Sequence, residues 1–182
     1  LTEAEKKPSV SYWAKEDALC PVCRKKFRQE LMHQGGGRTI AGNLTDELHR
    51  NYEPSKKYGR VYPLIYEIGC CPHCHTALFW KDFKDIKDPE TFDRIMQDEQ
   101  HRIKEVEAIF PHYDLNDERT LYDGTAMYYL ALLCYEKADI AYAPTFKRAE
   151  ISLRLAWLCN EIERVCPEHN YGYIAQVFYR KA

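Results

Sequence analysis

Cys20-Pro21-Val22-Cys23 and Cys71-Pro72-His73-Cys74 are two matching stretches, and the expected architecture of the chain follows from them. In each stretch two cysteines flank two residues, and proline follows the first cysteine. Two such turns brought together supply four thiolates in a tetrahedral arrangement, which suits Zn²⁺. We therefore predict one structural zinc ion whose ligands are Cys20, Cys23, Cys71 and Cys74.

A metal site of this kind holds structure and leaves no position open for chemistry. Four sulfur ligands complete the tetrahedron, so no catalytic water can bind the metal. The alternative is a pair of redox-active or disulfide-forming turns, but the strand–helix–strand pattern of thioredoxin-type motifs is missing around them. Three neighbours of the second turn are further candidates for the site, namely Cys70, His73 and His75.

The position after the second cysteine of each turn predicts a local strain. In many such turns this residue is glycine, because the backbone there adopts a left-handed conformation. Here the two positions hold Arg24 and His75. If the same turn is kept, each of these residues costs about 1 kcal/mol.

The composition is that of a folded soluble protein. The 182 residues are 45% hydrophobic and 30% charged, with a formal net charge of −2. This balance creates no global positive field that would attract nucleic acid or an anionic membrane. No run is long and apolar enough to span a bilayer, and the polar start at residues 1–7 is unlike a secretory signal. Together with the paired cysteines, these features predict a reducing, cytoplasmic compartment.

The first half of the chain predicts a small β module built around the two turns. We expect residues 1–12 to be a flexible lead-in and residues 13–87 to form a zinc-ribbon-like metal-binding module. One strand is expected at residues 26–33, leaving the first turn, and another at residues 61–68, where Leu64, Tyr66 and Ile68 lie on one face. Between these strands, residues 43–51 predict a short helix from their capping residues and leucine spacing.

The second half predicts an antiparallel, tetratricopeptide-like α-helical bundle over residues 88–182. Asp88-Pro89 starts a helix with an N-cap and a first-turn proline, and an apolar stripe runs from Phe92 to Phe110. The overall fold class is thus α+β, a small β zinc-ribbon-like module followed by a helical bundle. Further helices are expected at about 125–137, between Pro144 and Pro167, and from Asn170 onward.

No catalytic residue is predicted. Cys134 and Cys159 lie on apolar helix faces, so we expect them to be small core residues. No acid, base or nucleophile constellation can be assembled from the sequence, which favours a non-enzymatic protein.

The combination of these motifs resembles an uncharacterised bacterial family defined by a domain of unknown function. Its members have a Cys-Pro-x-Cys turn followed by Phe, a Pro-Leu-Ile-Tyr segment, a second such turn, an Asp-Phe pair and a helical C-terminal half. The resemblance begins near Trp13, and it implies zinc and this architecture without assigning a reaction. The matching positions are Phe27 after Cys20–Cys23, Pro63–Tyr66, Cys71–Cys74, Asp82-Phe83, Gly37-Arg38, Thr45–Arg50 and Leu155–Leu158.

Three functions are compatible with these features. The first is a zinc-binding scaffold that presents tyrosines of residues 122–142 to a protein partner. The second is a nucleic-acid-binding regulator that uses basic residues around the zinc turns. The third is a thiol redox protein that uses the cysteine pairs. The basic residues in question are Arg24, Lys25, Lys26, Arg28, Lys56, Lys57 and Arg60.

Overall fold

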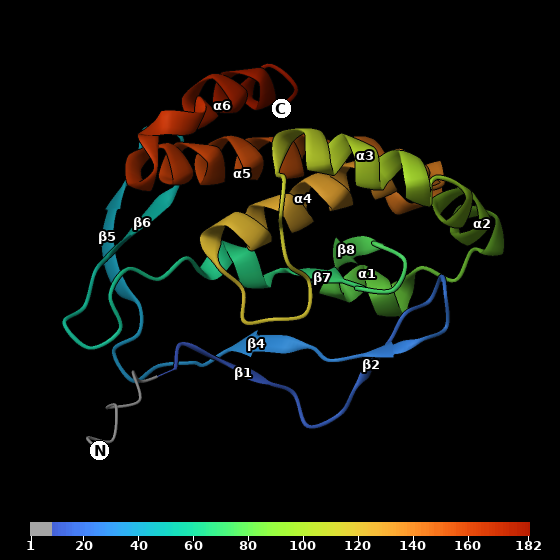
Figure 1. The fold of residues 1–182 in the computed structure, drawn as a ribbon, viewed down its shortest axis with the longest axis horizontal. Coiled ribbons are helices and arrows are strands. Elements are labelled where there is room, and N and C mark those ends of the chain that lie inside the picture. The colour runs from blue at the N-terminus through green and yellow to red at the C-terminus, as the bar shows by residue number, and fades with distance from the viewer. Residues whose placement is uncertain (1–8) are drawn as a thin grey trace.

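The computed structural model describes residues 9–182, with short strands in the first part of the chain and helices in the second (Figure 1). Within these residues the strands form small antiparallel pairs. The predicted α+β class is therefore confirmed. Residues 1–8 of the predicted lead-in lie outside the described part, whereas Ser11 and Tyr12 belong to the first strand.

Each strand in the described part pairs with one other strand, and two of the pairs flank the cysteine turns. The first turn lies between β2 and β3, and the second lies between β7 and β8. The pairs are β1 (Ser11–Trp13) with β4 (Glu30–Met32), β2 (Ala18–Leu19) with β3 (Lys26–Phe27), β5 (Ile40–Leu44) with β6 (Arg50–Glu53), and β7 (Ile68–Cys70) with β8 (Ala77–Phe79).

The helices follow the second cysteine turn, apart from one short 3₁₀ helix before it. No helix within residues 9–182 is both long and apolar enough to cross a membrane. The α-helices are α1 (Trp80–Asp85), α2 (Pro89–Gln97), α3 (Glu99–Ile109), α4 (Leu121–Tyr135), α5 (Pro144–Val165) and α6 (Tyr171–Tyr179), and the 3₁₀ helices are η1 (Pro63–Tyr66), η2 (Ile140–Tyr142) and η3 (Pro167–His169).

Helix α4 forms the centre of the core. Every residue from Asp123 to Tyr135 is buried, because apolar residues surround the whole helix and leave no polar face. It packs against η1, β7 and β8 as well as against α3 and α5, and Figure 1 shows it between these two sets. The β2–β3 and β7–β8 pairs and the helical half therefore share one continuous core.

The predicted tyrosine surface of residues 122–142 is wrong for the three tyrosines that α4 buries, whereas Tyr122 and Tyr142 are half-buried. The exposed fractions of Tyr128, Tyr129 and Tyr135 are 0%, 7% and 0%. Two of these tyrosines form hydrogen bonds inside the core. The Tyr128 hydroxyl donates to the Leu64 carbonyl at 3.1 Å, and the Tyr135 hydroxyl accepts the Phe79 N–H at 3.1 Å. The tyrosines thus satisfy buried backbone groups, as polar-tipped aromatic residues do in cores.

Residues 63–66 form the 3₁₀ helix η1, so the strand predicted over 61–68 is wrong except at its end. Pro63 occupies the first helical position, where its missing N–H costs nothing. Ile65 is buried against α4, and a Cβ atom on Gly124 would lie only 2.3 Å from the Ile65 Cβ. The glycine lets η1 approach the central helix at backbone distance.

The helix predicted at 43–51 is also wrong, because this segment belongs to the β5–β6 hairpin. The two leucines whose spacing suggested a helix, Leu44 and Leu48, are 49% and 76% exposed. The hairpin contacts α5 through His49, whose ring stacks on Trp157 at 4.5 Å. The Trp157 indole N–H also donates to Glu47 at 2.8 Å. Contacts with α5, which is distant in the sequence, therefore outweigh the helical preference that the leucine spacing suggested.

The helix boundaries are confirmed in part. Asp88 caps α2 by accepting the Thr91 N–H at 3.0 Å, and α5 runs between the two expected prolines. The long stripe from residue 92 is divided at Asp98, where ψ is 2° and α2 ends. Helix α4 begins before the expected residue 125, because Thr120 and Asp123 form a capping box.

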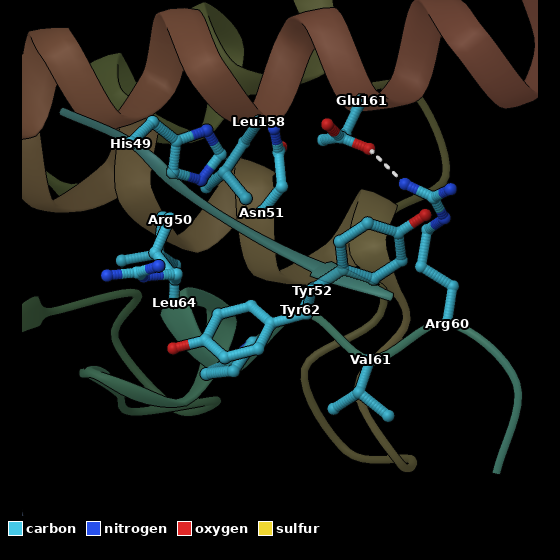
Figure 2. Close-up of a pocket in the computed structure, with 11 residues that line it drawn as sticks. His49, Arg50, Asn51, Tyr52, Arg60, Val61, Tyr62, Leu64, Leu158 and Glu161 are labelled. Atoms are coloured by element: carbon cyan, nitrogen blue, oxygen red, sulfur yellow. Dashed lines mark ion pairs between the residues drawn. The ribbon is translucent and has the colours of Figure 1, made fainter. Parts of the chain in front are cut away.

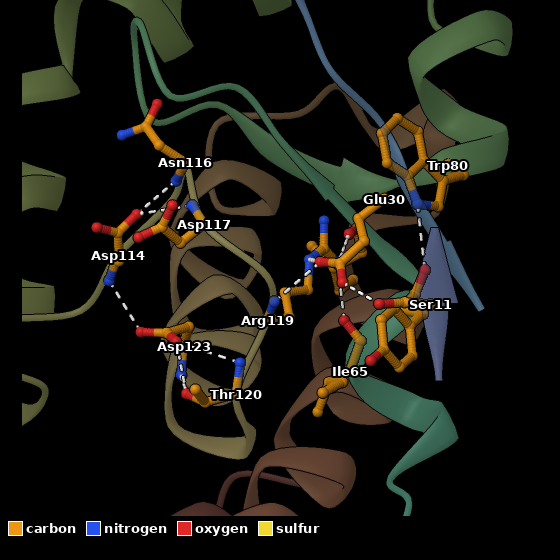
Figure 3. A network of polar contacts seen from close by, with 12 residues as sticks. Ser11, Glu30, Ile65, Trp80, Asp114, Asn116, Asp117, Arg119, Thr120 and Asp123 are labelled. Carbon is orange, nitrogen blue, oxygen red and sulfur yellow. Dashed lines mark hydrogen bonds and ion pairs between the residues drawn. The ribbon is translucent and has the colours of Figure 1, made fainter. Parts of the chain in front are cut away.

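A buried ion pair holds the first strands against the start of α4 (Figure 3). Glu30 is 1% exposed, and its carboxylate accepts the Arg119 N–H at 3.0 Å and lies 3.7 Å from the Arg119 Nε. The Arg119 guanidinium also donates to the Ile65 and Ile68 carbonyls, both at 2.7 Å, and Ser11 donates to Glu30. Both charges are thus paired, as burial requires.

Replacing Gly124 with alanine should destabilise the protein although alanine is the better helix former. The gain in helix propensity is about 1 kcal/mol, but the Cβ would overlap Ile65, and such overpacking costs on the order of 3 kcal/mol. We expect a net loss of about 2 kcal/mol in the free energy of unfolding, measured by urea denaturation.

Gly172→Ala in α6 is the matched control, because its Cβ would meet nothing nearer than the Glu163 Cγ at 3.4 Å. We expect this change to alter stability by less than about 1 kcal/mol. Equal effects of the two substitutions would contradict the close packing of η1 on α4.

Candidate metal centre

The two cysteine turns have the same backbone structure. In each, the residue after the second cysteine donates its N–H to the carbonyl of the first: Arg24 to Cys20 at 3.0 Å and His75 to Cys71 at 2.9 Å. The N–H of the first cysteine donates back across the hairpin at 3.0 and 2.9 Å. The sequence match thus reflects two turns built alike.

The residue after each second cysteine has the left-handed backbone that the sequence predicts. Its φ is 61° at Arg24 and 52° at His75. Residues with a Cβ are disfavoured there by about 1 kcal/mol or more. Both turns therefore keep the tight geometry at a cost in backbone free energy at Arg24 and His75.

The four cysteine sulfurs converge to tetrahedral spacing. All four Sγ atoms lie within 4.8 Å of one another. The Cys20–Cys74 separation is 3.6 Å and the Cys23–Cys71 separation is 3.7 Å. A tetrahedron with metal–sulfur bonds of about 2.3 Å has edges of about 3.8 Å, whereas a disulfide bond is about 2.05 Å long. The cluster can therefore hold a metal ion.

The four sulfurs are enclosed by the two turns and share hydrogen bonds with one another. Cys20, Cys71 and Cys74 are buried, and Cys23 is half-buried. Hydrogen bonds from Cys20 and Cys71 lower the pKa of Cys74, and the Thr76 hydroxyl lies 3.1 Å from its sulfur. The hydrogen bonds of Cys71 with Cys20 and Cys74 raise the pKa of Cys71. Only a bound cation would let all four sulfurs ionise together.

The three further candidates stand outside the four-sulfur cluster. His73 Nε2 lies 3.1 Å from the Lys26 carbonyl, so it joins the second turn to β3. His75 Nδ1 lies 3.9 Å from the Glu99 carboxylate. Cys70 is buried in β7. Among residues 9–182, the four cysteines form the one group of histidine, cysteine or acidic side chains whose ligand atoms converge.

Arg102 of α3 is a neighbour of the cluster that the sequence analysis missed. It is 0% exposed and donates to the Cys74 carbonyl at 3.0 Å. The structure buries Arg102 together with Ile95 and Val106, whereas the neighbouring Ile103 is half-buried. The available signal was spacing, because Arg102 stands seven residues after Ile95 and four before Val106.

The remaining cysteines and basic residues behave differently from the cluster. Cys134 and Cys159 are buried as predicted, and burial raises the pKa of Cys159 to about 12.

The basic residues that were considered for nucleic-acid binding do not lie together on one surface. Figure 1 shows the 54–62 loop and the first cysteine turn, beside β2, at opposite ends of the long axis.

A small cleft lies between β6 and α5, away from the cysteines (Figure 2). His49, Tyr62 and Glu161 line it, and Arg60 closes one side through an ion pair with Glu161 at 3.6 Å. Its volume of about 30 Å³ holds about one water molecule. This cleft is therefore too small for a substrate, whereas a larger hollow of about 1260 Å³ lies between residues 9–11, the 56–62 loop and the start of α4. The four-cysteine cluster is the candidate site because its ligand atoms converge.

Comparisons with known proteins place the chain in context. The model of the family described as "Uncharacterized protein conserved in bacteria (DUF2225)" matches residues 13–182. An "Uncharacterized protein" of Borreliella burgdorferi is 39% identical over 174 residues, which are 95% of this chain and 62% of that protein. The chain thus spans less than two thirds of this relative. No solved structure matches the chain.

Arg24→Gly should stabilise the protein, because glycine adopts a φ of 61° without the Cβ penalty. Arg24 is exposed, so few contacts are lost. We expect a gain of about 0.5–1 kcal/mol in the free energy of unfolding, measured with the metal bound. Lys25→Gly, at the next exposed position, is the control and should be neutral or destabilising. A loss of stability in Arg24→Gly would contradict the turn geometry.

Proposed function

This chain belongs to the DUF2225 family of bacterial proteins, and we propose that it is a zinc-binding, non-enzymatic scaffold protein. In this proposal, Cys20, Cys23, Cys71 and Cys74 hold one structural Zn²⁺. The observation that carries the proposal is the convergence of four sulfurs within 4.8 Å. Zinc is the metal that best suits a closed, tetrahedral set of thiolates.

The proposed role of the metal is to join two hairpins that are too small to hold each other. The β2–β3 and β7–β8 hairpins have strands of only two or three residues, and such hairpins are marginal alone in water. Phe27 adds the apolar part of the joint, with its ring 6.1 Å from Trp80 and 5.9 Å from Phe83. A metal supplies the remaining free energy where the core is thin.

We place the proposed scaffold role in the helical half of the chain. The protein is proposed to work in the cytoplasm, which is a reducing compartment. Support comes from exposed apolar side chains near the start of α5, where Ile140 is 87% and Phe146 is 71% exposed. Exposed apolar groups of this kind are common at protein-binding surfaces. The zinc-ribbon-like and tetratricopeptide-like descriptions of the two halves remain part of the proposal.

The two alternative functions have less support. A redox protein would pair the cysteines within each turn, yet the sulfur contacts of 3.6 and 3.7 Å join different turns. A nucleic-acid-binding regulator would gather its basic residues on one face, yet the two basic segments lie far apart (Figure 1). We therefore place the structural metal first.

The purified, reduced protein should contain one zinc per chain by elemental analysis. Cys23→Ser and Cys74→Ser should each lower the zinc content and the melting temperature, because a lost thiolate opens the coordination shell. Removal of a structural zinc commonly abolishes folding of a small module. Cys166→Ser is the control, since Cys166 is exposed and outside the cluster, and it should keep full zinc. A metal-free protein with disulfides Cys20–Cys23 and Cys71–Cys74 would favour the redox function instead.

The interaction part of the proposal has a separate test. Phe146→Ser should leave the melting temperature unchanged within about 1–2 °C, because the side chain is 71% exposed. The same change should reduce cross-linking of the protein to its partner in cells. Lys181→Ser, at the far end of the chain, is the control. Unchanged cross-linking by Phe146→Ser would show that this surface is not the interface.

A further inference from the structure

We infer that the buried Arg102 supplies the positive charge that offsets the negative metal centre, and so couples α3 to metal binding. This inference rests on the metal site proposed above. Four thiolates and one divalent cation carry a net charge of about −2. Such a charge in a buried site needs a compensating group nearby.

Arg102 is placed to meet that need. Its side chain is 0% exposed, and among residues 9–182 it is the largest of the fully buried side chains. The guanidinium donates to the Cys74 carbonyl at 3.0 Å, so it contacts the backbone of a proposed ligand directly. It also donates to the Ile95 carbonyl at the end of α2. Burying an arginine so completely costs several kcal/mol unless an anion balances it.

The carboxylate nearest to Arg102 is already shared with another cation. Asp98 Oδ2 lies 3.7 Å from Arg102, beyond hydrogen-bond distance, and this oxygen has no hydrogen-bond partner. The other oxygen of Asp98 lies 3.0 Å from the Lys137 ammonium. The Arg102 Nε has no acceptor either. Asp98 therefore balances Lys137 more closely than Arg102.

The positive charge of Arg102 affects a buried thiol near it, that of Cys134. Burial raises the pKa of Cys134, and the positive charge of Arg102 opposes that rise. Cys134 lies beside the second turn, where its sulfur accepts the Ala77 N–H at 3.4 Å. The positive charge thus acts on a buried thiol beside the second turn.

Arg119 shows what a buried arginine with a purely structural role looks like in the same protein. Its guanidinium lies 3.7 Å from the buried Glu30, the same separation as that of Arg102 from Asp98, but no second cation among residues 9–182 shares Glu30. The Arg119 guanidinium also donates to two carbonyls at 2.7 Å. None of its nitrogens is buried without a partner, in contrast to Arg102. Arg119 therefore provides a matched control for the loss of a buried arginine.

The test is the affinity of the full chain for Zn²⁺ and Co²⁺, measured by competition with a chelator. Arg102→Met should weaken the affinity by about 10–100-fold, the range seen when groups that support metal ligands are removed. Arg102→Lys keeps the charge and should retain the affinity within about fivefold. Arg119→Met should lower stability but leave the affinity of the folded protein equal to that of the wild type.

Lys137→Met tests the same charge balance without changing a buried residue. Lys137 is 32% exposed, so this variant should fold. Losing Lys137 frees Asp98 to neutralise Arg102, and the metal affinity should fall by about threefold. This variant decides the question if Arg102→Met does not fold.

The outcomes separate the two proposals. If the wild-type protein binds neither ion, the metal site itself is wrong and the inference falls with it. If the wild type binds metal but Lys137→Met and every folded Arg102 variant bind it equally well, only the role of Arg102 is overturned. Equal losses in Arg102→Met and Arg102→Lys would assign Arg102 a packing role and also overturn the inference.

Discussion

The fold depends on the complete burial of α4. A helix with no polar face is stable only when other elements cover it on all sides. The helices α3 and α5 cover one part of its surface, and η1, β7 and β8 cover another. The helical half cannot be completed without the strand pairs, and the second cysteine turn is therefore built into the core.

The first cysteine turn has a weaker connection to that core. Its hairpin contributes Phe27 to the core cluster, and the four sulfurs and His73 provide the remaining links to the second turn. A metal ion bound at this place would stabilise the contact between the two hairpins, as a larger apolar interface would. This explains why the cysteines are divided equally between a hairpin in the core and one at its edge.

Local signals in the sequence predicted local features well. The cap at Asp88, the prolines around α5 and the strained position at Arg24 all depend on residues close in sequence. The β5–β6 hairpin and η1 were missed, because His49 on Trp157 and Ile65 on Gly124 are contacts between distant segments. The four-cysteine cluster could be predicted from two spaced cysteine pairs. The place of Arg102 beside it depends on the packing of α3, which no short motif encodes.

The pairing of Glu30 with Arg119 joins residues 89 positions apart. During synthesis on the ribosome, the Glu30 carboxylate stays in water until the start of α4 has emerged. Both cysteine turns are complete well before then, at residue 74. The residues of the sulfur cluster are thus synthesised early, whereas docking of the N-terminal strands through this ion pair must wait for the second half of the chain. A chain truncated before Arg119 would therefore retain all four sulfurs and yet lack the group that anchors β4.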